Sequence, residues 1–199
     1  MLGKLADWLY GVITRPVATL NEIAREKPVG WGLLIYTGVT LLSWIAVIFD
    51  PATYEAYQEM MYLLPIAIPL YAILIAVLLF SFLFLFIFSL ALHLIARLLG
   101  GKGGYRNLFS AYTFASFPLI ITAPITVISG FLGNFGSFLS GLTSFGISIW
   151  VLVLQVIAVR ESHGFSTGIS VLSYIITIVI LVILPIALII WRMIAYLLM

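Results

Sequence analysis

Long apolar stretches separated by short polar connections run through most of the chain. Apolar residues dominate five stretches, at about residues 29–49, 66–96, 108–131, 137–159 and 168–191. A helix of about 20 apolar residues crosses the hydrocarbon core of a bilayer, whereas an open strand leaves its backbone groups unpaired in lipid. Each stretch is therefore predicted to be a transmembrane helix. The predicted fold class is all-α, a polytopic membrane helix bundle with five transmembrane helices.

Residues 1–28 show a different pattern, in which apolar positions recur at helical spacing between polar ones. Leu5 and Leu9 share one helix face, and Leu20 and Ile23 share another, while Pro16 suits the first turn of the second helix. This pattern predicts two amphipathic helices lying at the membrane interface, with their polar face in cytoplasmic water. A protein-docking face is the alternative interpretation of the same helices.

Two domains follow from this contrast. Residues 1–28 are predicted to form the interfacial cytoplasmic segment, and residues 29–199 the five-span membrane domain. Trp8 and Trp31 are expected at headgroup depth, where indole rings gather.

The second span is longer than a bilayer requires. Residues 62–92 hold no charge, and as a helix they would be about 47 Å long against a hydrocarbon core of about 30 Å. Two spans would need more residues, so one over-long helix is predicted, entered or kinked near Pro65 and Pro69. Ahead of it, Asp50 and Pro51 are typical of a helix start and predict a short amphipathic helix.

Prolines and small residues mark irregular and tightly packed places within the spans. Proline removes a backbone donor and clashes with the preceding turn, so the candidate kinks are Pro118, Pro124 and Pro185. Gln155, the one amide within a span, is predicted to hydrogen-bond to a neighbouring helix. Small residues at four-residue spacing permit close helix approach and predict a helix-packing stripe on span four: Gly136, Ser140, Ser144 and Ser148.

Charge gives the predicted bundle an orientation. The chain is 64% hydrophobic and 8% charged, which excludes a water-soluble fold because soluble domains are about 25% charged. Eight of the nine Lys and Arg residues fall in segments that share one side if all five stretches span. The positive-inside rule therefore places the N-terminus in the cytoplasm and the C-terminus outside. The eight are Lys4, Arg15, Arg25, Lys27, Arg97, Lys102, Arg106 and Arg160.

Residues suited to catalysis or metal binding are sparse. The absence of Cys excludes disulfides and thiolate metal sites, and His93 and His163 alone are too few ligands for a metal. No carboxylate is placed to orient a base beside a nucleophile, so the chain is predicted not to be an enzyme and to use no cofactor. No basic tract interleaved with aromatics suggests nucleic acid as a partner.

Three segments in fixed order carry a family resemblance. They are RPVATLNEIAREKP at 15–28, LLGGKGGYRNLFSAYTFASFP at 98–118, and the stretch from Trp150 through HGFSTG at 163–168. Together they resemble the Yip family, membrane proteins named for interacting with Ypt/Rab GTPases. The resemblance implies five helices with a cytoplasmic N-terminus and, for eukaryotic relatives, a role in traffic between the endoplasmic reticulum and the Golgi. About 28 residues stand in place of their long cytosolic N-terminal region, so the chain looks more like the compact bacterial and archaeal members.

Resemblance and charge pattern together predict a non-enzymatic adaptor or organiser of membrane or trafficking partners. The expected partners are the lipid bilayer, anionic lipid headgroups, and a membrane protein or a second copy of the chain. The over-long second span and the proline-interrupted third span keep a second hypothesis open, a small transporter, channel or lipid-moving protein. The expected location is the cell membrane in a prokaryote and the endoplasmic reticulum or Golgi in a eukaryote. The candidate cytoplasmic interaction surface is Lys102, Tyr105, Arg106, His163 and Phe165.

Overall fold

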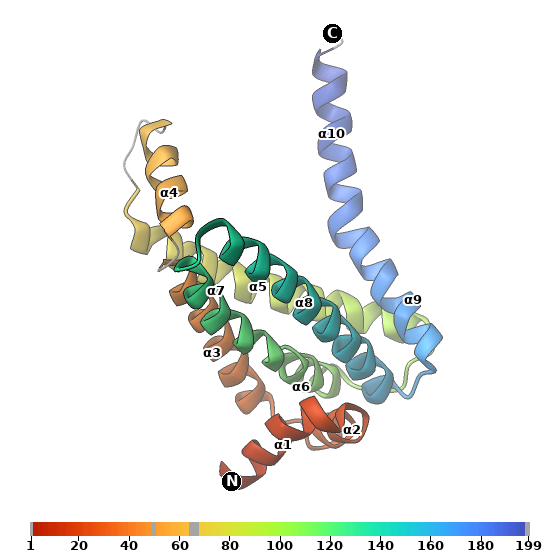
Figure 1. The fold of residues 1–199 in the computed structure, drawn as a ribbon. Coiled ribbons are helices and arrows are strands. Elements are labelled where there is room, and N and C mark those ends of the chain that lie inside the picture. Colours follow the sequence, from red (N-terminus) through yellow and green to blue (C-terminus); the bar gives the residue numbers. More distant parts are fainter. Residues whose placement is uncertain (1, 49–50, 64–67, 198–199) are drawn as a thin grey trace.

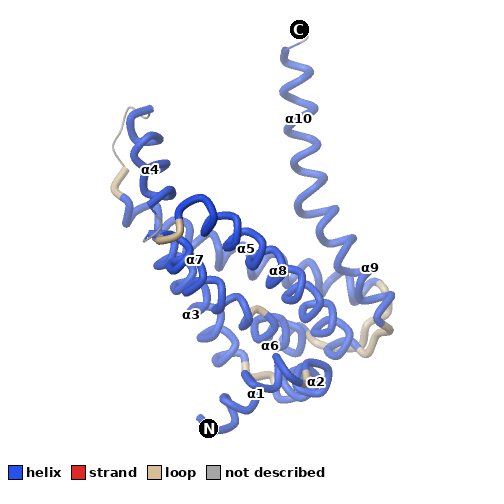
Figure 2. The backbone as a smooth tube through the Cα atoms, viewed as in Figure 1, coloured by secondary structure: helices blue, strands red, loops and turns tan. Residues whose placement is uncertain are grey.

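Helices joined by short connections make up the structure (Figures 1 and 2). A computed structural model describes residues 2–48, 51–63 and 68–197, and within these ranges no strand occurs. The predicted all-α fold class is confirmed. In chain order the elements are α1 Leu2–Thr14, α2 Pro16–Glu26, α3 Val29–Ile48, α4 Pro51–Leu63, α5 Leu70–Leu98, α6 Tyr105–Ala115, η1 Phe117–Ile121, α7 Thr122–Gly130, α8 Gly133–His163, α9 Thr167–Ile178, η2 Val179–Ile183 and α10 Leu184–Leu197.

Five helical segments are long and apolar enough to cross a membrane, as predicted. They are Val29–Ala46, Leu70–Leu98, Tyr105–Gly130, Phe135–His163 and Thr167–Tyr196. Helix α5 is the predicted single over-long span, and it begins directly after Pro69 rather than at residue 66. Pro65 lies outside the described residues. The predicted short helix after Asp50 is α4, which begins at Pro51.

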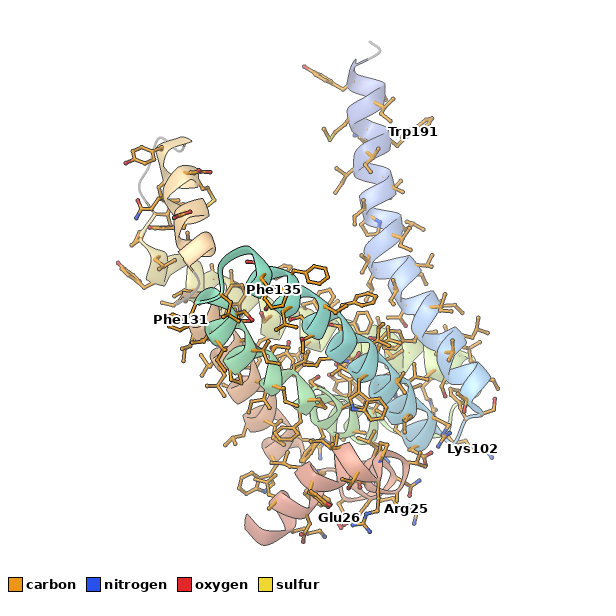
Figure 3. The ribbon with its side chains drawn as sticks, in the orientation of Figure 1. Arg25, Glu26, Lys102, Phe131, Phe135 and Trp191 are labelled. Atoms are coloured by element: carbon orange, nitrogen blue, oxygen red, sulfur yellow. The ribbon has the colours of Figure 1, made fainter. Side chains whose placement is uncertain are left out.

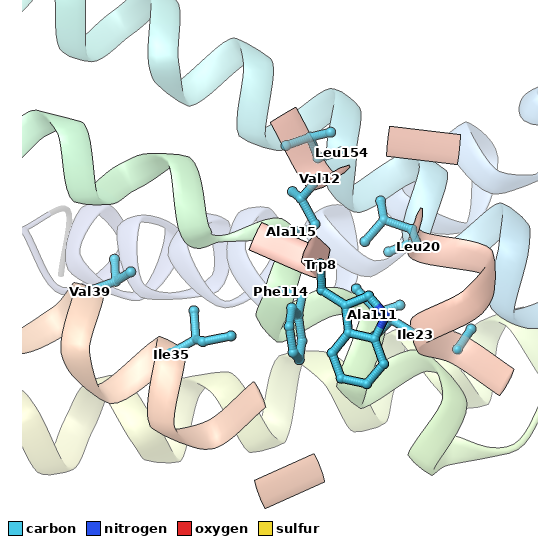
Figure 4. Packing of buried hydrophobic residues seen from close by; sticks show 12 residues of the cluster. Trp8, Val12, Leu20, Ile23, Ile35, Val39, Ala111, Phe114, Ala115 and Leu154 are labelled. Carbon is cyan, nitrogen blue, oxygen red and sulfur yellow. The ribbon is translucent and has the colours of Figure 1, made fainter. Parts of the chain in front are cut away.

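The two N-terminal helices form as predicted, and they pack under one end of the bundle (Figure 1). Val12, Leu20 and Ile23 are fully buried in a cluster shared with α3, α6 and α8. Trp8 is 6% exposed, and its ring meets the Phe114 ring edge-on at 5.6 Å (Figure 4). The Trp8 ring therefore packs on α6 inside the protein, and its depth at the headgroups stays a prediction.

Two of the three candidate kinks interrupt their helices. Pro118 lies in the 3₁₀ segment η1, which separates α6 from α7. Pro185 follows the π-helical segment η2, as expected where a proline cannot donate to the carbonyl one turn earlier. Pro124 is the third residue of α7, which begins directly after η1, so the interruption lies just ahead of it. A kink at Pro124 itself stays a prediction.

The predicted packing stripe holds for part of its length. Gly136 is buried, and a Cβ there would lie 1.9 Å from the Ser129 carbonyl oxygen, so only glycine fits. Ser140 and Ser144 are half-buried, whereas Ser148 is exposed. Each four-residue step advances about 40° beyond a full turn. Ser148 is thus rotated away from the neighbouring helix, and its assignment to the stripe is wrong.

The third connection is shorter than predicted. Helix α8 begins at Gly133 rather than near residue 137, leaving Phe131 and Leu132 between α7 and α8. The prediction for Gln155 is confirmed, because the Tyr174 hydroxyl donates to its Oε1 atom and joins α9 to α8. Beyond η2, helix α10 runs away from the other spans, and most of its side chains are exposed (Figures 1 and 3).

All eight bases predicted to share one side lie at one end of the bundle. This end, termed the basic end, consists of residues 2–28, 97–106 and 160–167. Arg25 and Lys102 lie there, and Phe131 lies at the far end of α7 (Figure 3). The arrangement is the one expected if all five segments cross a membrane.

Single cysteines test the predicted orientation directly, because the chain has none. Lys102→Cys and Ser166→Cys at the basic end should react with a membrane-impermeant maleimide from the cytoplasmic side only. Tyr62→Cys and Phe131→Cys, at positions 88% and 86% exposed, should react from the outside only. Reversed labelling would overturn the orientation, and labelling of both pairs from one side would contradict the five crossings.

Candidate interaction surface at the basic end

The loop at residues 99–104 is pressed against the last turn of α8. The Lys102 backbone N–H donates to the His163 carbonyl oxygen at 3.2 Å. A Cβ at Gly103 would lie 1.8 Å from the Ser162 carbonyl oxygen, and one at Gly101 would lie 2.7 Å from the His163 ring. Any side chain at Gly103 would collide with backbone. The GGKGG sequence is therefore explained by close packing of two backbones.

A histidine pair lies beneath this loop, between α5 and α8. The His93 Nδ1 and His163 Nε2 atoms are 3.0 Å apart, and the His163 Nδ1 atom lies 3.1 Å from Ser162 Oγ. Ser162 Oγ also lies 2.6 Å from the Ala158 carbonyl oxygen, which can only accept. If the single Ser162 proton goes to that carbonyl, His163 Nδ1–H donates to Ser162, and His93 Nδ1–H donates to His163. This assignment follows from the hydrogen-bond network and leaves Nε2 as the unprotonated nitrogen of a neutral His93 ring.

The pair is a hydrogen-bonded junction between α5 and α8. Among the described residues, no group of three or more His, Cys, Asp or Glu side chains is placed to hold a metal ion. The two rings bond directly, which requires at least one of them to be neutral, because two fully protonated rings would face each other with N–H donors. The junction therefore joins α5 to α8 through two imidazoles of which at most one is positively charged.

The predicted interaction surface divides into an exposed part and a buried part. Lys102 and Arg106 are exposed, as predicted. His163 is only 2% exposed, so its assignment to the exposed surface is wrong, because the glycine loop and Phe165 cover its ring. Phe165 is half-buried, as is Tyr105, whose hydroxyl lies 3.0 Å from Ser89 Oγ. Tyr105, His163 and Phe165 therefore form the more buried part of the surface, and Lys102 and Arg106 form its exposed part.

Helix α2 is hydrogen-bonded to the last turn of α8, at the basic end. The Asn21 side-chain amide donates to Glu161 Oε2 at 2.6 Å, and Arg160 pairs with the other Glu161 oxygen at 2.8 Å. Glu161 thereby links the N-terminal helices to the end of α8. All three segments that carry the family resemblance meet at the basic end.

Pairing of acids with bases leaves this end strongly positive. Lys4 pairs with Glu26 and lies 3.7 Å from Glu22. The hydrogen bond to Glu26 raises the pKa of Lys4 above its usual range. Together with Arg160 and Glu161, these pairs engage most of the nearby carboxylates. Among the described residues, six bases at this end have no carboxylate partner: Arg15, Arg25, Lys27, Arg97, Lys102 and Arg106.

Sequence reasoning missed the histidine pair. The two residues are 70 positions apart, and each alone is typical of an interfacial polar residue at a helix end. The available signal was topological, because His93 and His163 lie close in sequence to Arg97 and Arg160, on the side predicted to be cytoplasmic, and the glycine loop follows His93.

Comparison with known proteins places these features within one family region. A family model described as the Yip1 domain matches residues 10–189, which includes the histidine pair, the glycine loop, the first four candidate spans and most of the fifth. No curated protein matches the chain. No solved structure matches it either.

Gly103→Ala should destabilise the protein through the contact with Ser162. We expect the free energy of unfolding to fall by about 1–3 kcal/mol, because the added methyl group meets backbone that cannot rotate away. Thermal unfolding of the purified protein in detergent measures the effect. Gly168→Ala is the matched control, since a Cβ there meets nothing within 4 Å. Equal stability of the two variants would contradict the predicted close approach.

A double-mutant cycle tests the histidine junction. His93→Ala, His163→Ala and the double variant should reveal a coupling free energy of about 1 kcal/mol, the usual contribution of one buried hydrogen bond. Chemical denaturation at neutral pH provides the free energies. Additive single effects would show that the two rings do not interact.

Proposed function

Because the chain belongs to the Yip1 family, we propose that it is a non-enzymatic adaptor that docks acidic segments of partner proteins at its basic end. It is a multi-pass integral membrane protein, as the family and the five apolar helices indicate. The proposed adaptor role concerns the part of the protein that lies outside the lipid.

One observation carries the proposal, the surplus of bases at the basic end. Six of them have no carboxylate partner among the described residues, and Arg25, Lys102 and Arg106 are exposed. Such a surface attracts acidic partners and increases their rate of encounter. Three of the carboxylates that could neutralise it, Glu22, Glu26 and Glu161, are engaged by Lys4 and Arg160.

Rigidity supports the same role. The exposed bases stand on backbone that is fixed by the Lys102 bond to His163, by the histidine junction and by the Asn21 bond to Glu161. A preorganised surface loses less conformational entropy when a partner binds. In the proposed orientation the basic end faces the cytoplasm, at the cell membrane of a prokaryote or at the endoplasmic reticulum or Golgi of a eukaryote.

A lipid-moving protein is the second candidate, and the broken third span favours it. Beside η1 a groove of about 510 Å³ opens between α3 and α7, and its lining residues are all apolar. They include Leu42, Ile45, Ile120 and Pro124. Such a lining suits an acyl chain rather than an ion. Flux of labelled lipid between the leaflets of reconstituted vesicles would favour this candidate over the adaptor.

Site-specific photo-crosslinking tests the adaptor role. A photoreactive amino acid at Lys102 or Arg106 should capture a protein with an acidic segment in native membranes, and the same group at Tyr62 should not. Charge reversal by Arg25→Glu should reduce capture at Lys102 by about fivefold or more, because like charges repel the partner. Capture of anionic lipid alone, or equal capture at Tyr62, would overturn the proposal.

A further inference from the structure

A second feature of the basic end is a groove of about 710 Å³ between the α2–α3 junction, α5 and α6. The polar part of its lining holds two bases, Lys27 and Arg106, and one carboxylate, Glu26, which pairs with Lys4. Phe86, Tyr105 and Phe109 form its aromatic part. The groove therefore joins positive charge to an apolar wall over a short distance.

The aromatic part belongs to a membrane-spanning segment. Phe86 lies within the span Leu70–Leu98 and is 43% exposed, and its ring stacks on buried Phe109 with centroids 5.3 Å apart. When α5 crosses the bilayer, this wall faces hydrocarbon. A water-soluble ligand has no access to it, whereas an acyl chain does.

The two bases of the polar part lie at helix ends. Arg106 is the second residue of α6, where the helix dipole favours anions and disfavours cations. Lys27 is the C-cap residue of α2 and also lies two residues before the start of α3, so the α2 dipole favours its charge and the α3 dipole disfavours it. Lys27 also has φ of 56°, a left-handed conformation that glycine adopts more readily than lysine.

Neither of the two bases is paired with a carboxylate of the described residues. The neighbouring Glu26 is paired with Lys4. A phosphate between the two bases would gain charge-assisted hydrogen bonds from both, and the nearby helix N-termini would add to the attraction.

We propose that this groove binds one anionic glycerophospholipid. Its phosphate lies between Lys27 and Arg106, and one acyl chain follows Phe86 and Phe109 along α5. The site would hold such a lipid in the leaflet at the basic end. It does not depend on the adaptor role, because two of the three exposed bases proposed to meet a partner protein, Arg25 and Lys102, lie outside the groove lining and only Arg106 is shared.

Lipid binding by the purified, delipidated full chain tests the site. Native mass spectrometry should count one tightly held phosphatidylglycerol, and affinity for phosphatidylcholine should be lower by about tenfold. Lys27→Ala with Arg106→Ala should reduce phosphatidylglycerol affinity by about 30-fold, taking about tenfold or less from each base. The matched control, Arg25→Ala with Lys102→Ala, removes the same charge from the same end and should change affinity by less than about threefold.

Two further variants separate lipid binding from structure and from simple anion binding. Lys27→Gly should raise the thermal unfolding temperature, because glycine relieves the left-handed backbone, and should still weaken lipid binding. Phe86→Ala should weaken binding of dioleoyl phosphatidylglycerol but not of glycerol phosphate, which has no acyl chain. Equal losses of phosphatidylglycerol affinity in the groove double variant and in the control double variant would overturn the proposal. It would also be overturned if inorganic phosphate competed with an affinity equal to that of the lipid and Phe86→Ala left that competition unchanged.

Discussion

The contact of the glycine loop with the last turn of α8 is the constraint on which the basic end depends. At Gly103 a Cβ would lie 1.8 Å from the Ser162 carbonyl oxygen, so the two backbones approach as closely as any residue allows. This contact sets the separation of α5 and α8, and the distance between His93 and His163 follows from it. The Tyr105 and Phe165 rings then fill the space beside the pair. A wider loop would separate the imidazoles and uncover His163.

Polar bonds in the structure are of two kinds, those within one helix and those between distant elements. Within the spans, serine and threonine hydroxyls mostly donate to carbonyls of their own helix, as Thr40 does to Tyr36. Bonds between distant elements occur within the spans, where Tyr174 donates to Gln155, and at the basic end, where Asn21 donates to Glu161 and His93 bonds to His163. Apolar packing alone gives little preference for one helix arrangement in lipid. Directional bonds between helices therefore help to fix which helices are neighbours.

The sequence predicted the parts of the fold that depend on hydrophobic length and missed those that depend on contacts between distant residues. Five spans, two amphipathic helices and the break at Pro118 are local consequences of apolar runs and proline chemistry. Trp8 could not be placed, because whether an indole meets lipid or protein depends on Phe114, more than a hundred residues away. The same holds for His163, whose burial depends on Gly101 and Gly103. Ser148 was misplaced for a geometric reason, since four-residue spacing rotates around a helix rather than following its axis.

The basic residues have two explanations, and their positions distinguish them. Orientation in the membrane requires positive charges on one side, and their number near the spans matters more than their individual positions. That requirement accounts for eight bases at one end. It does not require a lysine in a left-handed conformation at position 27 or an arginine in the first turn of α6, since an exposed site elsewhere at the same end would orient the chain equally well. The left-handed backbone at Lys27 and the α6 dipole at Arg106 each cost stability in the unliganded protein. In the proposed lipid site, an anion held between the two bases would offset that cost, whereas the shared side of the eight bases is explained by topology alone.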